Sequence, residues 1–272
     1  MSEPSAPSWR DHDDRPVADV PAVPGPDDPA FYVPIGELQG ADYRRNAFAQ
    51  GTSEELAALT GLVDLASGTR VLDVGCGDAR HLRAGAARGI VGTGVEVAPG
   101  LAAAARAAAQ RDGVVLDIRT GDARHLDAIL GAERGTFDVV WSLCQGALGT
   151  SPVSDPQVVA GMARAVRPGG AVVVTVFHAL FAARHLAPGD AFDPIHLVHH
   201  QRSEVRGPDH TRAEFDLWTA AYTVREAVGL VADAGLVATS VRGVQPGAYG
   251  ARADGEVALD DPELLVLARR PG

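Results

Sequence analysis

Short apolar runs alternate with amphipathic, helix-like stretches through most of this chain. Five of the runs are typical of strands: 70–74, 90–97, 114–119, 137–142 and 171–177. The stretches between them have helical period, and the one at 99–111 opens with Pro99 and continues in alanine, a strong helix former. Strands that alternate with helices of this length predict a parallel sheet with crossover connections.

The pattern changes in the last third of the chain. Residues 177–186 look helical, and 197–206 and 211–222 indicate two strands joined by the turn-like tetrapeptide 207–210. Two final strands, 237–244 and 263–270, follow with no helix between them. The fold we expect is therefore α/β: a doubly wound, mostly parallel sheet of seven strands with a terminal antiparallel strand. An inserted helix and β-hairpin would occupy about 178–222.

Several short sequence patterns predict where helices begin. Thr52 with Glu55, and Thr223 with Glu226, each make the spacing of a capping box at a helix start. The first would open a helix at 53–66. Asp155 followed by a proline predicts a helix N-cap, and residues 31–34 are predicted to be extended.

The first thirty residues differ in composition from the rest. Residues 1–30 hold seven prolines and seven acidic residues and few large apolar ones. Such a segment cannot bury enough surface to offset its ordering entropy, so we expect a disordered tail. Residues 31–272 are then expected to form one domain.

Charge and cysteine usage narrow the function. The formal net charge is −11, every basic residue is arginine, and no stretch resembles a basic stripe, so no nucleic-acid partner is expected. The two cysteines, Cys76 and Cys144, give neither a disulfide framework nor zinc spacing. Together with the lack of a signal-peptide pattern or a run of ~20 apolar residues, this predicts a cytoplasmic protein with no membrane partner.

The candidate chemistry centres on the segment 71–82. A strand runs into Asp73-x-Gly75-x-Gly77 and then into a helix, as in a nucleotide-binding βαβ unit. Arg80 stands where a pyrophosphate-binding loop has its third glycine, and Asp73 lies two residues before the first. A ligand with an ammonium group suits this carboxylate and the turn carbonyls, and S-adenosylmethionine is such a ligand.

This segment resembles the first motif of class I S-adenosylmethionine-dependent methyltransferases. The likeness extends from about Tyr32 to the C-terminus. The segments 43–55, 144–149 and 214–222 are similar to a bacterial subgroup of small-molecule-type methyltransferases. The resemblance implies a methyltransferase domain over 31–272, S-adenosylmethionine as cofactor, and a small or medium-sized acceptor methylated by SN2 displacement.

Ligands of open α/β sheets bind beyond the carboxyl ends of the strands, and four such ends carry suitable residues. Glu96 can accept hydrogen bonds from two ribose hydroxyls. In the resembling family an acid after the third strand accepts from the adenine amine, and Asp122 stands there, although it also suits a helix N-cap. The loop after the fourth strand is where methyl donor and acceptor would meet. The full set expected to bind the cofactor is Asp73, Gly75, Cys76, Gly77, Glu96, Val97, Gly121, Asp122, Ala123, Cys144 and Gln145.

The acceptor side is expected to include Tyr43, Arg44, Phe48, Phe181 and Trp218 as substrate-binding residues. No fixed catalytic triad is visible, and methyl transfer does not require one. The candidates for a catalytic role are His178, His199, His200 and Gln145, although each histidine also suits an ordinary position in a loop or strand. No metal site is expected.

Two other functions remain open from the sequence. One is a nicotinamide-dependent oxidoreductase on a similar sheet, which Asp73, Arg80 and the terminal antiparallel strand pair disfavour. The other is a non-catalytic S-adenosylmethionine-binding regulatory module. The insertion near the predicted pocket favours an enzyme over such a module.

Overall fold

The structure is a computed structural model that describes residues 25, 29–40, 50–207 and 211–272. Of the tail expected over 1–30, it describes only Gly25 and the start of the 3₁₀-helix η1 (Pro29–Tyr32). The rest of that tail lies outside the described residues.

A twisted sheet forms the core, in the order β3-β2-β1-β4-β5-β10-β9. The first five of these strands are parallel, and β10 runs antiparallel to both of its neighbours. This arrangement confirms the predicted doubly wound, mostly parallel sheet with a terminal antiparallel strand. The strands are β1 (Arg70–Val74), β2 (Val91–Glu96), β3 (Asp117–Thr120), β4 (Phe137–Ser142), β5 (Val166–His178), β9 (Val237–Val244) and β10 (Glu263–Arg269).

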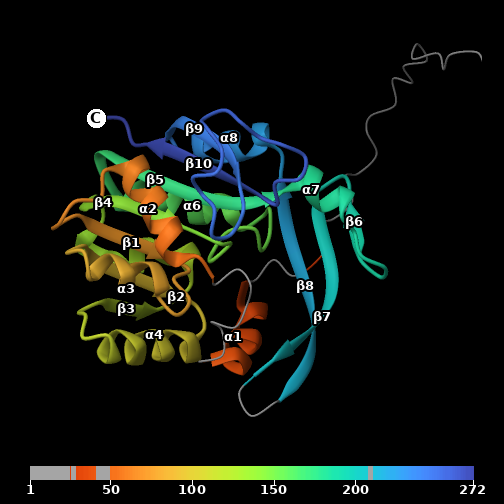
Figure 1. Ribbon diagram of the computed structural model, residues 1–272, viewed down its shortest axis with the longest axis horizontal. Coiled ribbons are helices and arrows are strands. Elements are labelled where there is room, and N and C mark those ends of the chain that lie inside the picture. Colours follow the sequence, from red (N-terminus) through yellow and green to blue (C-terminus); the bar gives the residue numbers. More distant parts are fainter. Residues whose placement is uncertain (1–24, 26–28, 41–49, 208–210) are drawn as a thin grey trace, which may run out of the picture.

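Helices cover both faces of the sheet (Figure 1). One face packs against α2 (Thr52–Val63), α3 (Arg80–Ala86) and α4 (Pro99–Arg111), through side chains such as Leu59, Leu82 and Ala105. The other packs against α5 (Leu126–Leu130), α6 (Asp155–Ala165) and α8 (Val224–Asp233), through Leu126, Met162 and Val231 among others. The short 3₁₀-helices η4 (Ala123–His125) and η5 (Gly131–Glu133) flank α5.

The insertion extends the sheet rather than standing apart from it. It consists of α7 (Ala179–Arg184), β6 (Ala191–Asp193), β7 (Val198–Arg206) and β8 (Arg212–Tyr222). The pairing of β4 with β5 ends at Val174, and β8 then pairs with β5 at Phe177 and His178. Because β10 occupies the other edge of β5, the β7–β8 hairpin rises from the carboxyl end of the sheet on the β4 side (Figure 1).

The segment expected to be extended at 31–34 is helical instead. Tyr32 ends η1, and Val33 begins α1 (Val33–Gln39), with a proline in its first turn. Proline fixes φ near the helical value and lacks only an N–H that a first turn leaves unbonded. Figure 1 shows α1 in the space between α4 and the hairpin, and it contacts both.

Two of the three predicted helix caps are wrong. The N-cap of α2 is Gly51, and the N-cap of α6 is Ser154. Glu55 and Asp155 are both fully buried and accept other hydrogen bonds, which are worth more there than a surface cap. The capping box of Thr223 and Glu226 at α8 is confirmed.

None of the described helices has the length and apolarity to traverse a lipid bilayer.

A crossing of two backbone segments at Gly75 sets the shape of the sheet's carboxyl edge. Gly75 has φ +76°, and a Cβ built on it would overlap the backbone of Gly146 and Ala147 in the loop after β4. A Cβ on Gly146 would overlap Gly75 in turn. Glycine at 75 is therefore required by the fold itself, in addition to any approach of a ligand.

We expect Gly75→Ala to destabilise the protein by more than about 2 kcal/mol, because it adds backbone strain to steric overlap. The matched control is Gly61→Ala in α2, where an added Cβ meets nothing within 4 Å. That change should be neutral or stabilise by up to about 1 kcal/mol. Urea unfolding measures the free energy of unfolding of both variants. Equal stability of the two would contradict the close backbone contact at Gly75.

Candidate functional site

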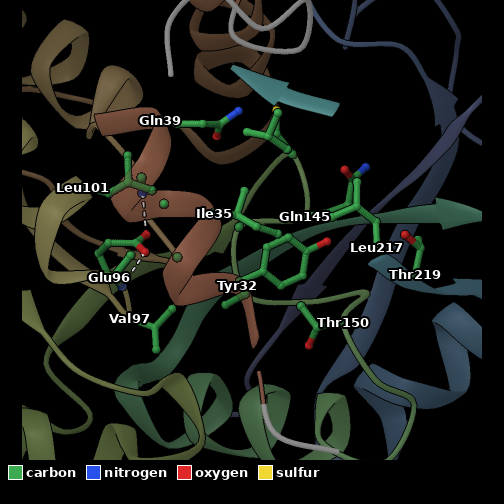
Figure 2. A pocket seen from close by; sticks show the side chains of 18 of the residues that line it. Tyr32, Ile35, Gln39, Glu96, Val97, Leu101, Gln145, Thr150, Leu217 and Thr219 are labelled. Atoms are coloured by element: carbon green, nitrogen blue, oxygen red, sulfur yellow. Dashed lines mark hydrogen bonds between the residues drawn. The ribbon is translucent and has the colours of Figure 1, made fainter. Parts of the chain in front are cut away.

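A cavity of about 850 Å³ opens at the carboxyl ends of the parallel strands. The turn after β1 and the ends of β2, β3 and β4 form one side, with Gly75, Glu96, Asp122 and Gln145 among the residues. The η1–α1 segment and the β7–β8 hairpin form the other (Figure 2). The strand-end residues chosen from sequence are thus largely brought together. Those lining the cavity are Gly75, Gly77, Glu96, Val97, Gly121, Asp122, Ala123, Cys144 and Gln145.

Glu96 is fixed at the end of β2 by backbone donors. Its two carboxylate oxygens accept hydrogen bonds from the N–H groups of Gly77 and Ala98, each at 2.9 Å. Burial raises the pKa of Glu96, although these backbone donors oppose the effect. The carboxylate therefore ties the first turn to the second and retains lone pairs for hydroxyl donors in the cavity.

Asp122 lines the cavity and also caps η4. One oxygen accepts from the backbone N–H of Arg124 at 2.8 Å, and the other accepts from the guanidinium of the same residue. Burial raises the pKa of Asp122, but the bonds from Arg124 outweigh it and the net pKa is lowered. The helix-cap role considered from sequence is present, and it holds the carboxylate at the cavity rim.

Asp73 and Cys76 lie behind the cavity instead of on its surface. Both are buried, and neither is a lining residue. Burial raises the pKa of the Asp73 carboxyl to about 7. The sulfur of Cys76 packs against Gly94 of β2. Any effect of these two residues on a ligand is thus exerted through the turn that they support.

Cys144 and Gln145 follow β4 in left-handed backbone conformations, with φ of 52° and 54°. Such conformations cost about 1–3 kcal/mol each in residues other than glycine and persist only where the surroundings impose them. The N–H of Cys144 donates to Thr175 Oγ1 at 2.7 Å, and Gln145 Nε2 donates to Glu263 Oε1 at 2.7 Å. This loop is the strained part of the site.

A buried polar cluster supports the loop from behind. Glu55 accepts hydrogen bonds from Arg80, from His81 and from the backbone N–H of Gly247. Arg80 Nη2 also lies 3.0 Å from the sulfur of Cys144, which in turn lies 3.0 Å from the Tyr249 hydroxyl. Arg80, which replaces the fingerprint's third glycine, thus joins α2, α3 and the loop after β4.

Three members of this cluster have ligand atoms close enough to hold a metal ion. The atoms of Glu55, His81 and Cys144 lie within 4.8 Å of one another. The guanidinium of Arg80 already contacts two of them, so it supplies the positive charge that a metal would bring. Burial also raises the pKa of the Cys144 thiol to about 12, and a thiol binds metal as the thiolate. The arrangement fits an ion-pair network better than a metal site.

The wall opposite the strand ends comes mainly from residues that the sequence analysis did not select. Tyr32 and Ile35 point into the cavity from η1 and α1, and Leu217 and Thr219 reach it from β8 (Figure 2). Thr150, after β4, also lines it, and its buried hydroxyl has no hydrogen-bond partner among the described residues. The alternation of β8 could have identified Leu217 and Thr219, since odd positions of this strand share one face.

Of the residues expected on the acceptor side, the two that the structure describes lie away from this wall. Trp218 projects from the other face of β8 and stacks on His200, and Phe181 stacks on His185. Neither is a lining residue. Tyr43, Arg44 and Phe48 lie outside the described residues.

The three histidine candidates for a base also lie off the cavity. His178 is buried, with Nδ1 3.0 Å from the carbonyl oxygen of Asp261. His199 pairs with Asp190, and His200 pairs with Asp216. Of the four catalytic candidates, Gln145 alone lines the cavity within the described part of the chain.

Comparison with known proteins agrees with this geometry. Residues 71–170 match the model of a methyltransferase domain. A ubiquinone biosynthesis O-methyltransferase from Xylella fastidiosa (strain 9a5c) is 33% identical over 122 residues, which are 44% of this chain and 47% of that protein. The chain thus matches about half the length of that curated relative.

Solved structures extend the likeness to most of the fold. The CcbJ methyltransferase from Streptomyces caelestis superposes with a TM-score of 0.70 over 88% of this chain and 98% of its own, at 18% identity. An S-adenosylmethionine-dependent methyltransferase from Clostridium acetobutylicum ATCC 824 gives 0.65 over 85% and 97%, at 11% identity.

The order of the core strands, the antiparallel β10 and the cavity at the strand ends are those of the class I methyltransferase fold. Residues 71–170 form a methyltransferase domain, and the chain has the fold of the class I S-adenosylmethionine-dependent methyltransferases. The cofactor of this family is S-adenosylmethionine, and the strand-end residues above are the ones that would hold it.

Replacing Glu96 tests the cofactor end of the cavity. We expect Glu96→Ala to weaken S-adenosylhomocysteine binding roughly tenfold to a hundredfold, since a hydrogen bond to a charged acceptor is worth about 1.5–3 kcal/mol. Titration calorimetry measures the affinity. The control is Asp117→Ala, which removes an exposed carboxylate from β3 outside the cavity and should change affinity less than threefold. If Glu96→Ala bound S-adenosylhomocysteine as tightly as the wild type, the cofactor would not bind at the end of β2.

The buried carboxyl of Asp73 predicts a dependence of stability on pH. Its folded pKa of about 7 lies above the ordinary value, so between about pH 4 and 7 the folded state binds more protons than the unfolded state. Its contribution to stability is therefore fully present below about pH 4 and is lost as pH rises to about 7. Relative to wild type, Asp73→Asn should gain stability across this window, by at most about 1.4 kcal/mol per pH unit. Urea unfolding at several pH values tests this, and parallel curves for the two proteins would contradict it.

Proposed function

We propose that this protein transfers a methyl group from S-adenosylmethionine to a small-molecule acceptor bound in the same cavity. The observation that carries the proposal is the continuity of one cavity of about 850 Å³ from the strand ends to the β7–β8 hairpin. A site of this kind has room for two ligands and lies within the usual size of small-molecule pockets.

The cofactor would occupy the strand-end side. Glu96 offers a carboxylate to ribose hydroxyls, and the segment around Asp122 offers polar groups to the adenine. Gly75 and Gly77, both with positive φ, leave the turn after β1 without side chains beside the ligand. When bound, S-adenosylmethionine supplies a methyl carbon already activated by the sulfonium.

The acceptor would lie between the loop after β4 and the wall formed by η1, α1 and β8. Tyr32, Thr150, Thr219 and Gln145 offer hydroxyl and amide groups there, and Ile35 and Leu217 offer apolar surface (Figure 2). In this proposal the insertion 178–222 serves the acceptor side through β7 and β8, while α7 and β6 support the hairpin.

The chain's own contribution would be alignment and exclusion of water. The charged residues that line the cavity within the described ranges are Glu96, Asp122, Glu204, Arg206 and Arg212. Glu204 pairs with both arginines on the hairpin, and the other two acids belong to the cofactor side. The hydroxyls and amide near Gln145 would orient a neutral acceptor rather than neutralise a charged one.

The alternative functions fit the site less well. A nicotinamide-dependent oxidoreductase would need a pyrophosphate at the first turn, where Arg80 replaces the glycine and is committed to Glu55. A non-catalytic regulatory module has no need of cavity space beyond that for the cofactor. Both differ from a methyltransferase in what they bind or release.

Ligand binding separates these functions. S-adenosylhomocysteine should bind with micromolar affinity and raise the free energy of unfolding by ~2.7 kcal/mol at 100 times its dissociation constant. NAD should give no shift of the melting temperature. A shift with NAD alone would favour the oxidoreductase.

A screen of small molecules with radiolabelled S-adenosylmethionine then tests catalysis. We expect label to appear in at least one small-molecule product and to disappear with excess S-adenosylhomocysteine. Binding of S-adenosylhomocysteine without methyl transfer to any small molecule would favour the regulatory module.

A further inference from the structure

The side chain of Gln145 is held by a buried acid from the far side of the sheet's carboxyl edge. Glu263 begins β10 and lies opposite Phe177 of β5 and Val244 of β9. It is 3% exposed and does not line the cavity, whereas Gln145 does. The hydrogen bond from Gln145 Nε2 to Glu263 Oε1, at 2.7 Å, is thus made behind the cavity wall.

This bond fixes which end of the amide the cavity meets. A carboxylate only accepts hydrogen bonds, so Gln145 must turn its NH₂ group to Glu263. The carbonyl oxygen of Gln145 then remains for the cavity, and Figure 2 shows this side chain among the residues that line it. A side-chain amide can ordinarily present either end, and the acid removes that choice.

The backbone of the loop after β4 also restricts the position of the Gln145 amide. Gln145 has φ 54°, and a Cβ built on Gly149 would lie 3.6 Å from the Phe177 ring and 3.7 Å from the Gln145 side chain. Thr175 of β5 accepts from the N–H of Cys144 and stands beside Glu263. The position of the amide is therefore set by β5 and β10 together, and Figure 2 shows Gln145 on the opposite side of the cavity from Glu96.

We propose that Glu263 is a positioning residue that makes Gln145 present its carbonyl oxygen to the acceptor, so that the site selects nucleophiles carrying a hydrogen, namely hydroxyl or amine groups. An O–H or N–H of the acceptor donates to Gln145 while a lone pair of the same oxygen or nitrogen attacks the methyl carbon. The bond from that carbon to sulfur breaks with its electron pair staying on sulfur, which gives S-adenosylhomocysteine, and the proton of the methylated atom passes to water. A carboxylate acceptor would instead face the carbonyl oxygen of Gln145 with the Glu263 carboxylate behind it, and would be rejected. This inference rests on the methyl-transfer function proposed above.

The protonation of Glu263 gives the arrangement a measurable signature. Burial raises the pKa of Glu263 to about 7, with Gln145 and Thr175 opposing this effect. Below that pH a protonated Glu263 can donate to the carbonyl oxygen of Gln145 and release its NH₂ group. The titratable and charged groups that act on Glu263 come from α2, α3 and the loops after β4 and β9: Glu55, Arg80, Cys144 and Tyr249.

The first experiment follows the Gln145 side-chain amide by ¹⁵N NMR in the full chain with S-adenosylhomocysteine bound, assigned by its loss in Gln145→Glu. We expect its signals to shift with a midpoint near pH 7 in the wild type and to show no such transition in Glu263→Gln. Glu214→Gln makes the same change on β8, at a side chain 63% exposed and outside the cavity, and should behave as wild type. Identical behaviour of the wild type and Glu263→Gln would overturn the proposal.

The second experiment uses the products of the methyl-acceptor screen. Methyl ethers or methylamines would support the proposed selectivity, and methyl esters or carbon-methylated products would overturn it. With an acceptor from the screen, Glu263→Gln should raise the KM for the acceptor at least tenfold and leave the KM for S-adenosylmethionine within threefold. A loss shared equally by both substrates, or none, would show that Glu263 has only a structural role.

These two experiments fail in different ways. If no small molecule is methylated, the proposed function fails, while the NMR titration still decides whether Glu263 orients Gln145. If methyl transfer occurs but Gln145 does not respond to Glu263, only the positioning role is lost.

Discussion

The close approach of Gly75 to Gly146 is the constraint on which the site depends. A parallel sheet delivers its strand ends to one edge, but the loops that leave those ends must still pass one another. Here the loop after β4 crosses the turn after β1 with backbone against backbone. Beside that crossing, Cys144 and Gln145 reach the cavity, and both have left-handed conformations. The first glycine of the motif therefore serves the loop after β4 as much as it serves a ligand.

A buried network of charge connects the elements at this crowded edge. Glu55 sits at zero exposure, yet burial does not raise its pKa overall, because hydrogen bonds and charge from His81 and Arg80 outweigh the desolvation and lower it. Removing one partner from such a cluster leaves an uncompensated buried charge, which costs several kcal/mol. Arg80 stands at the position of the fingerprint's third glycine. It contacts Glu55 of α2 and Cys144, and so it connects α2 to the loop after β4.

The sequence predicted the framework well and the contacts poorly, for physical reasons. Strands β1, β4 and β9 and helix α4 have the predicted bounds, because hydrophobic period and proline position act locally. Glu55 and Asp155 were expected to take part in helix caps, but both are buried acceptors for groups far away in the chain, such as Arg80 and Tyr222. Spacing along a helix does not reveal a partner that only the tertiary fold supplies. The same limit applies to Tyr32, whose segment gave an extended pattern and forms a helix over the cavity.

The residues around the cavity fall into two groups, those inside the matched methyltransferase domain and those outside it. The methyltransferase domain match spans residues 71–170, which includes Glu96, Asp122 and Gln145. Tyr32 and Ile35 precede that range, and Leu217, Thr219 and Glu263 follow it. In the proposed function the strand ends meet the cofactor and the opposite wall meets the acceptor, so the two sides of the cavity come from different parts of the chain. In the proposed function the acceptor meets groups inside the matched segment, such as Gln145 and Thr150, as well as the wall outside it, and the contact between Gln145 and Glu263 is where the two parts meet.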